Sequence, residues 1–134
     1  MMALSTVHAR MKRQKIREFA GNDYLHGDNI QEQIPCLKNH NEQQFLFGVY
    51  SSAEIWTVLS VNYLFAAYEG SFITLRLDTE TDTVYEYFQE NDFSSQIHLE
   101  DGRSIWVKSP ELCSLMLNVM LLLKKIPCGT QLKE

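Results

Sequence analysis

Residues 55–76 read IWTVLSVNYLFAAYEGSFITLR, and they carry the clearest structural pattern of the chain. The pair Glu69-Gly70 suits the two-residue loop of a β-hairpin, because glycine accepts the positive φ that such loops need. A hairpin that turns there places Ala66 opposite Ile73 and makes one face of the two strands apolar. The opposite face carries a mixed set of side chains, which we expect to be partly covered: Tyr63, Phe65, Phe72, Thr74 and Arg76.

Short runs rich in aromatic and β-branched residues extend this pattern on both sides of the hairpin. They predict seven strands, at about 45–50, 55–60, 62–69, 71–77, 84–88, 95–100 and 103–108. Between the last two strands, a three-residue loop over 100–102 places Ile97 and Ile105 on one face, whereas a two-residue loop would mix apolar and polar residues. We therefore expect the three-residue loop, with a left-handed glycine at its end.

The residues after the last strand predict a C-terminal helix. Ser109 suits the N-cap, Pro110 the first helical position and Glu111 the first turn. Apolar residues at spacings of three and four form a stripe that we expect to pack on the sheet: Leu112, Leu115, Met116, Val119, Leu122, Leu123 and Ile126. Leu117 and Leu121 lie nearly opposite this stripe, so one sheet cannot bury both faces. Both leucines are therefore candidates for contact with a partner.

The first 44 residues divide into a predicted helix and a predicted linker. Residues 3–20 contain neither proline nor glycine, and they place Leu4, Val7 and Met11 on one face. Residues 21–44 contain glycine, proline and many Asn and Gln residues, which is typical of a linker. The expected organisation is a basic N-terminal helix, a linker, a β-rich domain with its C-terminal helix and a short tail, over residues 1–20, 21–44, 45–126 and 127–134.

The order of seven antiparallel strands and one terminal helix resembles the pleckstrin-homology-like superfold, which includes GRAM-like modules. Residues 56–65 and 72–75, around the Glu69-Gly70 turn, look like the early strands of bacterial members. This resemblance implies an α+β fold over about 45–126. It would be a bent seven-stranded antiparallel barrel or sandwich closed by the C-terminal helix, with an extra N-terminal helix. Members that bind phosphoinositides place Lys and Arg in the first inter-strand loop, but here that loop is Ser51-Ser52-Ala53-Glu54 and contains no base.

Size and composition indicate one globular domain in a reducing compartment. The chain has 134 residues, of which 45% are hydrophobic and 22% are charged. Its three cysteines, at 36, 113 and 128, are an odd number without paired spacing. The first residues lack an apolar run of signal-peptide length, and the run over 112–123 is shorter than the roughly 20 residues that span a bilayer. We therefore expect a cytoplasmic protein.

The net charge of −5 is unevenly distributed along the chain. Residues 1–20 hold five bases and one acid, whereas the remainder holds seven bases and sixteen acids, a net charge of −9. The five N-terminal bases are Arg10, Lys12, Arg13, Lys15 and Arg17. The acidic remainder disfavours nucleic acid or anionic lipid as a partner of the main body. The basic helix itself either attracts an anionic partner or lies against the acidic body of its own chain or a neighbour, and the −9 favours the second interpretation.

One acidic run has part of the pattern of a calcium-binding loop. Asp78, Glu80 and Asp82 alternate as the first three ligands would. The sixth position is Thr83, where glycine is required, and the twelfth is Gln89, where a bidentate glutamate should stand. We therefore expect a solvated acidic turn without metal.

The remaining cysteine and histidine residues give no complete chemical pattern. Cys36 and His40 are spaced like half of a zinc site, but no second pair has matching spacing. His98 fits a half-exposed position in a strand. Cys113 lies in an apolar helix, where burial should raise its pKa, and Cys128 fits an exposed bystander thiol. We therefore predict no catalytic residue, no metal and no cofactor.

Three hypotheses for function follow from these features. The first is a non-enzymatic protein-interaction or scaffolding module that self-associates as a homodimer through surplus apolar surface on the last helix, the first helix or both, and Leu117 and Leu121 motivate it. The second is a membrane-surface adaptor that binds anionic lipid through the basic residues from Arg10 to Arg17. The third is a small ligand-binding protein or enzyme with a pocket between the sheet and a helix, near Tyr85, Tyr87 and Trp106.

Overall fold

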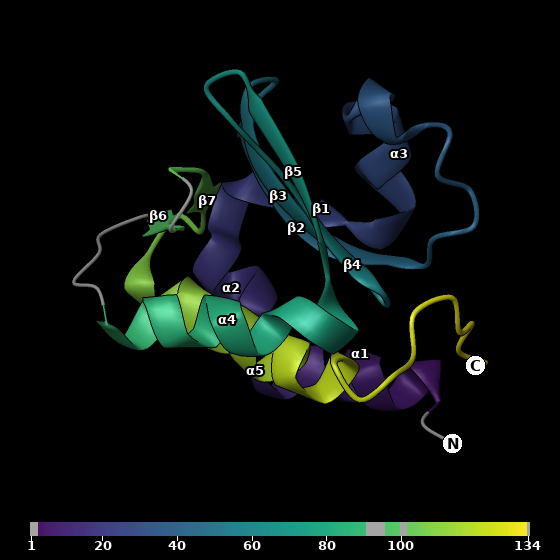
Figure 1. Cartoon of the computed structure of the whole chain (residues 1–134). Coiled ribbons are helices and arrows are strands. Elements are labelled where there is room, and N and C mark those ends of the chain that lie inside the picture. The colour runs from purple at the N-terminus through teal and green to yellow at the C-terminus, as the bar shows by residue number, and fades with distance from the viewer. Residues whose placement is uncertain (1–2, 91–95, 100–101, 134) are drawn as a thin grey trace.

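The computed structural model in Figure 1 describes residues 3–90, 96–99 and 102–133, and it is α+β. Its main sheet is antiparallel and follows chain order: β1 (Tyr24–His26), β2 (Phe45–Ser52), β3 (Ile55–Ser60), β4 (Tyr63–Tyr68) and β5 (Ser71–Arg76). A separate antiparallel pair contains β6 (Gln96–His98) and β7 (Ser104–Trp106). The helices are α1 (Leu4–Arg13), α2 (Ile16–Ala20), α3 (Ile30–Gln33), α4 (Leu77–Glu90) and α5 (Pro110–Leu123).

The strands of the described residues do not form the seven-stranded barrel that the resemblance implied. They form an open five-stranded sheet and a separate two-stranded sheet; the Thr57 hydroxyl of β3 donates a hydrogen bond to the Trp106 carbonyl oxygen of β7, but the two sheets do not pair as strands. Residues 84–88, which we predicted as the fifth strand, are helical within α4. Leu77, Thr81 and Val84 are buried at spacings of four and three, which is the period of a helix and not of a strand.

The hairpin of β4 and β5 has the predicted register. Ala66 pairs with Ile73, and the two-residue loop has positive φ at both Glu69 (47°) and Gly70 (91°). Positive φ at both loop residues is the geometry that matches the right-handed twist of the flanking strands. The prediction for this stretch is confirmed.

The hairpin of β6 and β7 also has the predicted register. Ile97 pairs with Ile105, the Leu99 N–H donates to the Arg103 carbonyl oxygen at 2.8 Å, and Gly102 has φ of 87°. Residues 100 and 101 of the loop lie outside the described residues. The pairing on either side of them fits a three-residue connection.

Both faces of the main sheet are covered, by different parts of the chain. One face, which includes Leu64 and Ile73, shares a core with α1, α2, α4 and α5. The other face, which includes Trp56 and Phe65, packs against the segment that contains α3. In Figure 1, α1, α4 and α5 lie together on one side of the sheet, away from α3.

The segment 21–44 is folded, although the sequence predicted a linker. It contains β1, α3 and three short 3₁₀ turns, at Gly21–Asp23, Gly27–Asn29 and Pro35–Leu37. Ile30, Ile34 and Leu37 are buried against the second face of the sheet. The segment lies so close to β2 that a Cβ at Gly27 would collide with the carbonyl oxygen of Phe45. This segment therefore provides the cover that we expected for the second face of the sheet.

Helix α5 begins where the sequence predicted. The Ser109 hydroxyl accepts a hydrogen bond from the Leu112 N–H at 3.2 Å, and Pro110 occupies the first helical position. Most of the predicted stripe is buried, with Leu115 and Leu122 partly buried at its border. Among the described residues, no helix is both long enough and apolar enough to cross a bilayer.

The predicted helix over 3–20 is interrupted at Lys15. Lys15 has the left-handed φ of 55°, and it separates α1 from α2. An unbroken helix with Val7 and Met11 in the core would turn Ile16 away from it, whereas after the break Ile16 and Ala20 are both buried. The cost of the strained residue is therefore offset by the burial of a second apolar pair.

Candidate functional site

The five basic residues from Arg10 to Arg17, here called the basic segment, lie on α1, on α2 and at the break between them. The side chains of Lys12, Arg13, Lys15 and Arg17 are exposed, whereas Arg10 is partly buried. The Arg10 Nε atom is buried without a hydrogen-bond partner. Four of the five sequence-predicted cations are therefore presented to solvent.

No ion pair joins the basic segment to any described residue. The nearby carboxylate of Asp23 is engaged by Lys108, whose Nζ atom lies 3.1 Å from the Asp23 Oδ2 atom. Two further ion pairs between described residues join Arg76 to Asp78 and Lys124 to Asp82. Ion pairing between described residues therefore gives no support to the interpretation that the basic segment lies against the acidic body of its own chain or a neighbour, which stays a prediction.

A hollow of about 390 Å³, here called the basic groove, lies between the basic segment and the first strand. Its lining residues come from α1, α2, β1 and the break between the helices: His8, Met11, Lys12, Lys15, Ile16, Arg17, Glu18, Tyr24 and His26. Met11 and Ile16 are its buried apolar residues. The groove thus combines two lysines, one arginine, two histidines and one glutamate with an apolar floor.

Arg17 is held over the ring of Tyr24. The guanidinium carbon lies 5.5 Å from the ring centroid, within the range of a cation–π contact. Burial raises the pKa of the Tyr24 hydroxyl, and the Arg17 charge acts against this shift. Tyr24 therefore remains a neutral platform, and the guanidinium keeps its N–H donors at the edges of its plane for an anion.

The left-handed Lys15 helps to shape this groove. The bend that it introduces lets residues before it (His8, Lys12) and after it (Arg17) line one hollow. Strained non-glycine residues concentrate at functional sites. Here the strain also serves the core, through Ile16 and Ala20, so the bend has a structural role beside its effect on the groove.

The two leucines that we predicted as partner contacts differ in their burial. Leu117 is only 2% exposed, and Leu121 is half-buried. Helices α1 and α2 both contact α5, and the Asn118 side-chain amide donates to the Gln14 side-chain oxygen at 3.1 Å. Leu117 thus belongs to a core that it shares with residues of α1 and α2, whereas Leu121 is only partly covered.

The acidic residues that resembled a calcium loop begin α4 instead of forming a turn. Asp78 accepts two hydrogen bonds from the Arg76 guanidinium, which holds the pKa of that carboxyl below its usual range. Glu80 accepts from the Arg76 backbone N–H, and Asp82 lies 2.7 Å from the Lys124 Nζ atom. Carboxylates are favourable in the first turn of a helix, so helix formation explains these residues.

The other candidate residues are dispersed over the fold. Cys36 is exposed, while the His40 ring packs against Phe65 with centroids 5.2 Å apart. Burial raises the pKa of the Cys113 thiol to about 12, as its helical position predicted. Cys128 is half-buried, and its thiol donates to the Tyr63 hydroxyl at 3.0 Å. The described residues contain no group of three or more His, Cys, Asp or Glu side chains placed to hold a metal ion.

Comparison of the chain with family models, with curated proteins and with solved structures gives no match.

The basic segment itself was predicted from the charge of the sequence alone. Sequence reasoning did not connect His8, Tyr24 or His26 with the basic segment, and it placed Tyr24 and His26 in a linker. The short alternation of Tyr24, Leu25 and His26 was the available signal for a strand there.

Proposed function

We propose that this chain is a membrane-surface adaptor that binds anionic lipid through the basic segment and groove. The observation that carries the proposal is that the basic segment forms no ion pair with described residues although the rest of the chain has a net charge of −9. Unpaired cations beside a hollow are available to the phosphate and carboxylate groups of lipid headgroups. The role requires no catalytic step.

An exposed aromatic residue favours a lipid surface over an acidic protein. Phe19 lies two residues after Arg17 and is 47% exposed, and only Phe72 is a comparably exposed large apolar residue among those described. Segments that combine cations with an aromatic residue bind at the boundary between headgroups and acyl chains. Phe19 would add apolar contact to the attraction of the charges.

The expected binding is reversible and depends on charge. Each Lys or Arg near an anionic leaflet contributes about 1 kcal/mol, whereas the acidic body is repelled by the same surface. Anionic leaflets of this kind face the cytoplasm, which fits the location expected from the sequence. Self-association remains an alternative, but the burial of Leu117 gives it less support.

Vesicle binding tests this proposal. The full chain should co-sediment with vesicles that contain phosphatidylserine and should not co-sediment with vesicles of phosphatidylcholine alone. Binding should weaken steeply as NaCl is raised, because the screening length falls from about 30 Å at 0.01 M to about 8 Å at 0.15 M. Equal binding to both vesicle types, or binding that salt does not change, would contradict the proposal.

A further inference from the structure

A second cavity, of about 310 Å³, lies between β5, α4 and the β6–β7 hairpin. It shares no lining residue with the basic groove. Its apolar wall contains Leu75, Val84 and Leu99, and its polar lining contains Glu80, Thr83, Tyr87 and Arg103. Cavities that bind small molecules begin at about 300 Å³ and combine apolar walls with a few placed polar groups, so this α4 pocket suits a small ligand.

Glu80 is fixed at one side of the α4 pocket. It comes from the first turn of α4, and one of its carboxylate oxygens accepts a hydrogen bond from the Arg76 backbone N–H at 2.8 Å. A carboxylate has about four acceptor positions, so this bond leaves acceptors for a ligand. The hydrogen bond orients the carboxylate before any ligand binds, which reduces the ordering cost of binding.

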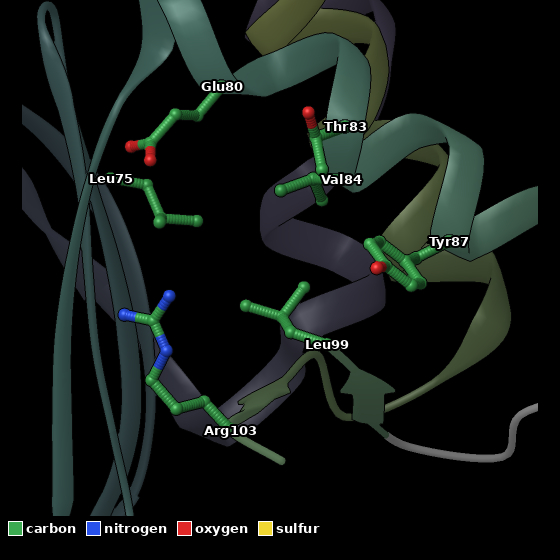
Figure 2. Close-up of a pocket in the computed structure, with 7 residues that line it drawn as sticks. All are labelled: Leu75, Glu80, Thr83, Val84, Tyr87, Leu99 and Arg103. Atoms are coloured by element: carbon green, nitrogen blue, oxygen red, sulfur yellow. The ribbon is translucent and has the colours of Figure 1, made fainter. Parts of the chain in front are cut away.

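Arg103 brings the opposite charge to the same side of the pocket. Figure 2 shows the Glu80 carboxylate and the Arg103 guanidinium extending toward the side where Leu75 lies, with Tyr87 and Leu99 across the cavity. A guanidinium has five N–H donors in a planar fork that fits a carboxylate, so Arg103 can contact a ligand beside the interaction that it already makes within the chain. The pocket therefore offers an acceptor for a cation and donors for an anion beside an apolar wall.

We propose that the α4 pocket binds a small zwitterion with an apolar side chain, such as an aliphatic or aromatic amino acid. The ligand ammonium group would contact Glu80, its carboxylate would contact Arg103, and its side chain would lie against Val84 and Leu99. A ligand with a single charge is attracted by one of the two residues and repelled by the other. This preference for opposite charges on one small molecule is the specificity that the pocket provides.

Calorimetric titration of the full chain with L-phenylalanine and L-leucine tests the proposal. At least one amino acid should bind, and 2-phenylethylamine and 3-phenylpropionate, which each lack one charged group, should bind about tenfold more weakly or worse, because each loses a charge-assisted hydrogen bond. Glu80→Gln should weaken amino-acid binding by a similar factor. Glu86→Gln, the same change at an exposed position on α4 outside the pocket, should leave binding unchanged.

Glu80→Gln retains an oxygen that can accept from the Arg76 N–H, and circular dichroism would establish that the variant is folded. Thr83→Trp provides a second variant, since Thr83 is exposed at the rim and an indole there would fill the cavity and abolish binding. The proposal is overturned if neither amino acid binds, if 2-phenylethylamine binds as tightly as phenylalanine, or if the folded Glu80→Gln and Thr83→Trp variants bind like the wild type. None of these results depends on binding to vesicles.

Discussion

Reversing the charge of two exposed lysines, in the double variant Lys12→Glu and Lys15→Glu, is expected to lower the affinity for phosphatidylserine vesicles by roughly 30-fold or more. Each lysine near an anionic leaflet contributes about 1 kcal/mol, and about 2 kcal/mol corresponds to that factor. The introduced glutamates are also repelled by the leaflet, so the estimate is a lower bound. Both side chains are exposed and line the basic groove, so the fold should tolerate the change.

The matched control is the double variant Lys38→Glu and Lys125→Glu. These lysines are also exposed, so the control carries the same net charge as the test variant. Neither lysine lines the basic groove. If the basic segment is the binding surface, the control should lose much less affinity. An equal loss in the two variants would mean that only total charge matters, and the assignment of the site would be wrong.

Replacing Leu37 by alanine is expected to lower the free energy of unfolding by about 2–5 kcal/mol, the usual cost of removing a fully buried leucine side chain. Leu37 is 0% exposed and belongs to the core between the α3 segment and the second face of the sheet. Urea denaturation followed by circular dichroism would measure the change. The size of the effect reports directly on whether residues 21–44 are part of the fold.

The adjacent variant Cys36→Ala is the control for Leu37→Ala. Cys36 is exposed on the same 3₁₀ turn, and surface substitutions of this kind usually change the free energy of unfolding by less than about 0.5 kcal/mol. A linker would tolerate both substitutions alike. Nearly equal midpoints for the two variants would show that the segment does not cover the sheet.

The parts of the fold that the sequence predicted well are those in which local geometry permits one arrangement. The Glu69-Gly70 loop requires positive φ, and only one register then keeps Ala66 and Ile73 on the apolar face. The start of α5 is similarly determined, because Ser109 and Pro110 agree on the first helical residue. In both cases neighbouring residues decide the structure without distant contacts.

The predictions of local structure were wrong where contacts between residues far apart in the sequence determine the structure. Residues 84–88 are rich in Val, Tyr and Phe, which favour strands, but burial of Leu77, Thr81 and Val84 selects the helical period. Residues 21–44 contain many turn-forming residues, yet Ile30, Ile34 and Leu37 become buried because the sheet presents an aromatic face to them. Propensity alone does not show that such a face exists.

The sequence predicted only part of the candidate site, because the rest of the site also depends on contacts between distant residues. Charge counting finds Lys12 and Arg17 directly, since five cations stand within eight residues. The groove also needs β1, which places Tyr24 beside Arg17, and the left-handed Lys15 between the helices. Both depend on packing against α5 and the sheet, which a pattern in one segment does not reveal.

Packing on α5 explains how the basic segment remains available. Helices α1 and α2 bury Val7, Ile16 and Ala20 in the core, so their polar faces, with four of the five cations, face outward. The apolar faces of these helices thus cover Leu117, while their charged faces remain for a partner. One pair of helices thereby stabilises the fold and, in our proposal, forms the binding surface.

Amide hydrogen exchange of the full chain, with and without phosphatidylserine vesicles, tests the location of that surface most directly. We predict slower exchange in peptides that cover residues 8–20 and 24–26 when vesicles are present, and unchanged exchange in peptides that cover the 51–54 loop and the 69–72 turn. Protection confined to those two loops, or the absence of protection in the basic segment while the chain is bound, would contradict the account.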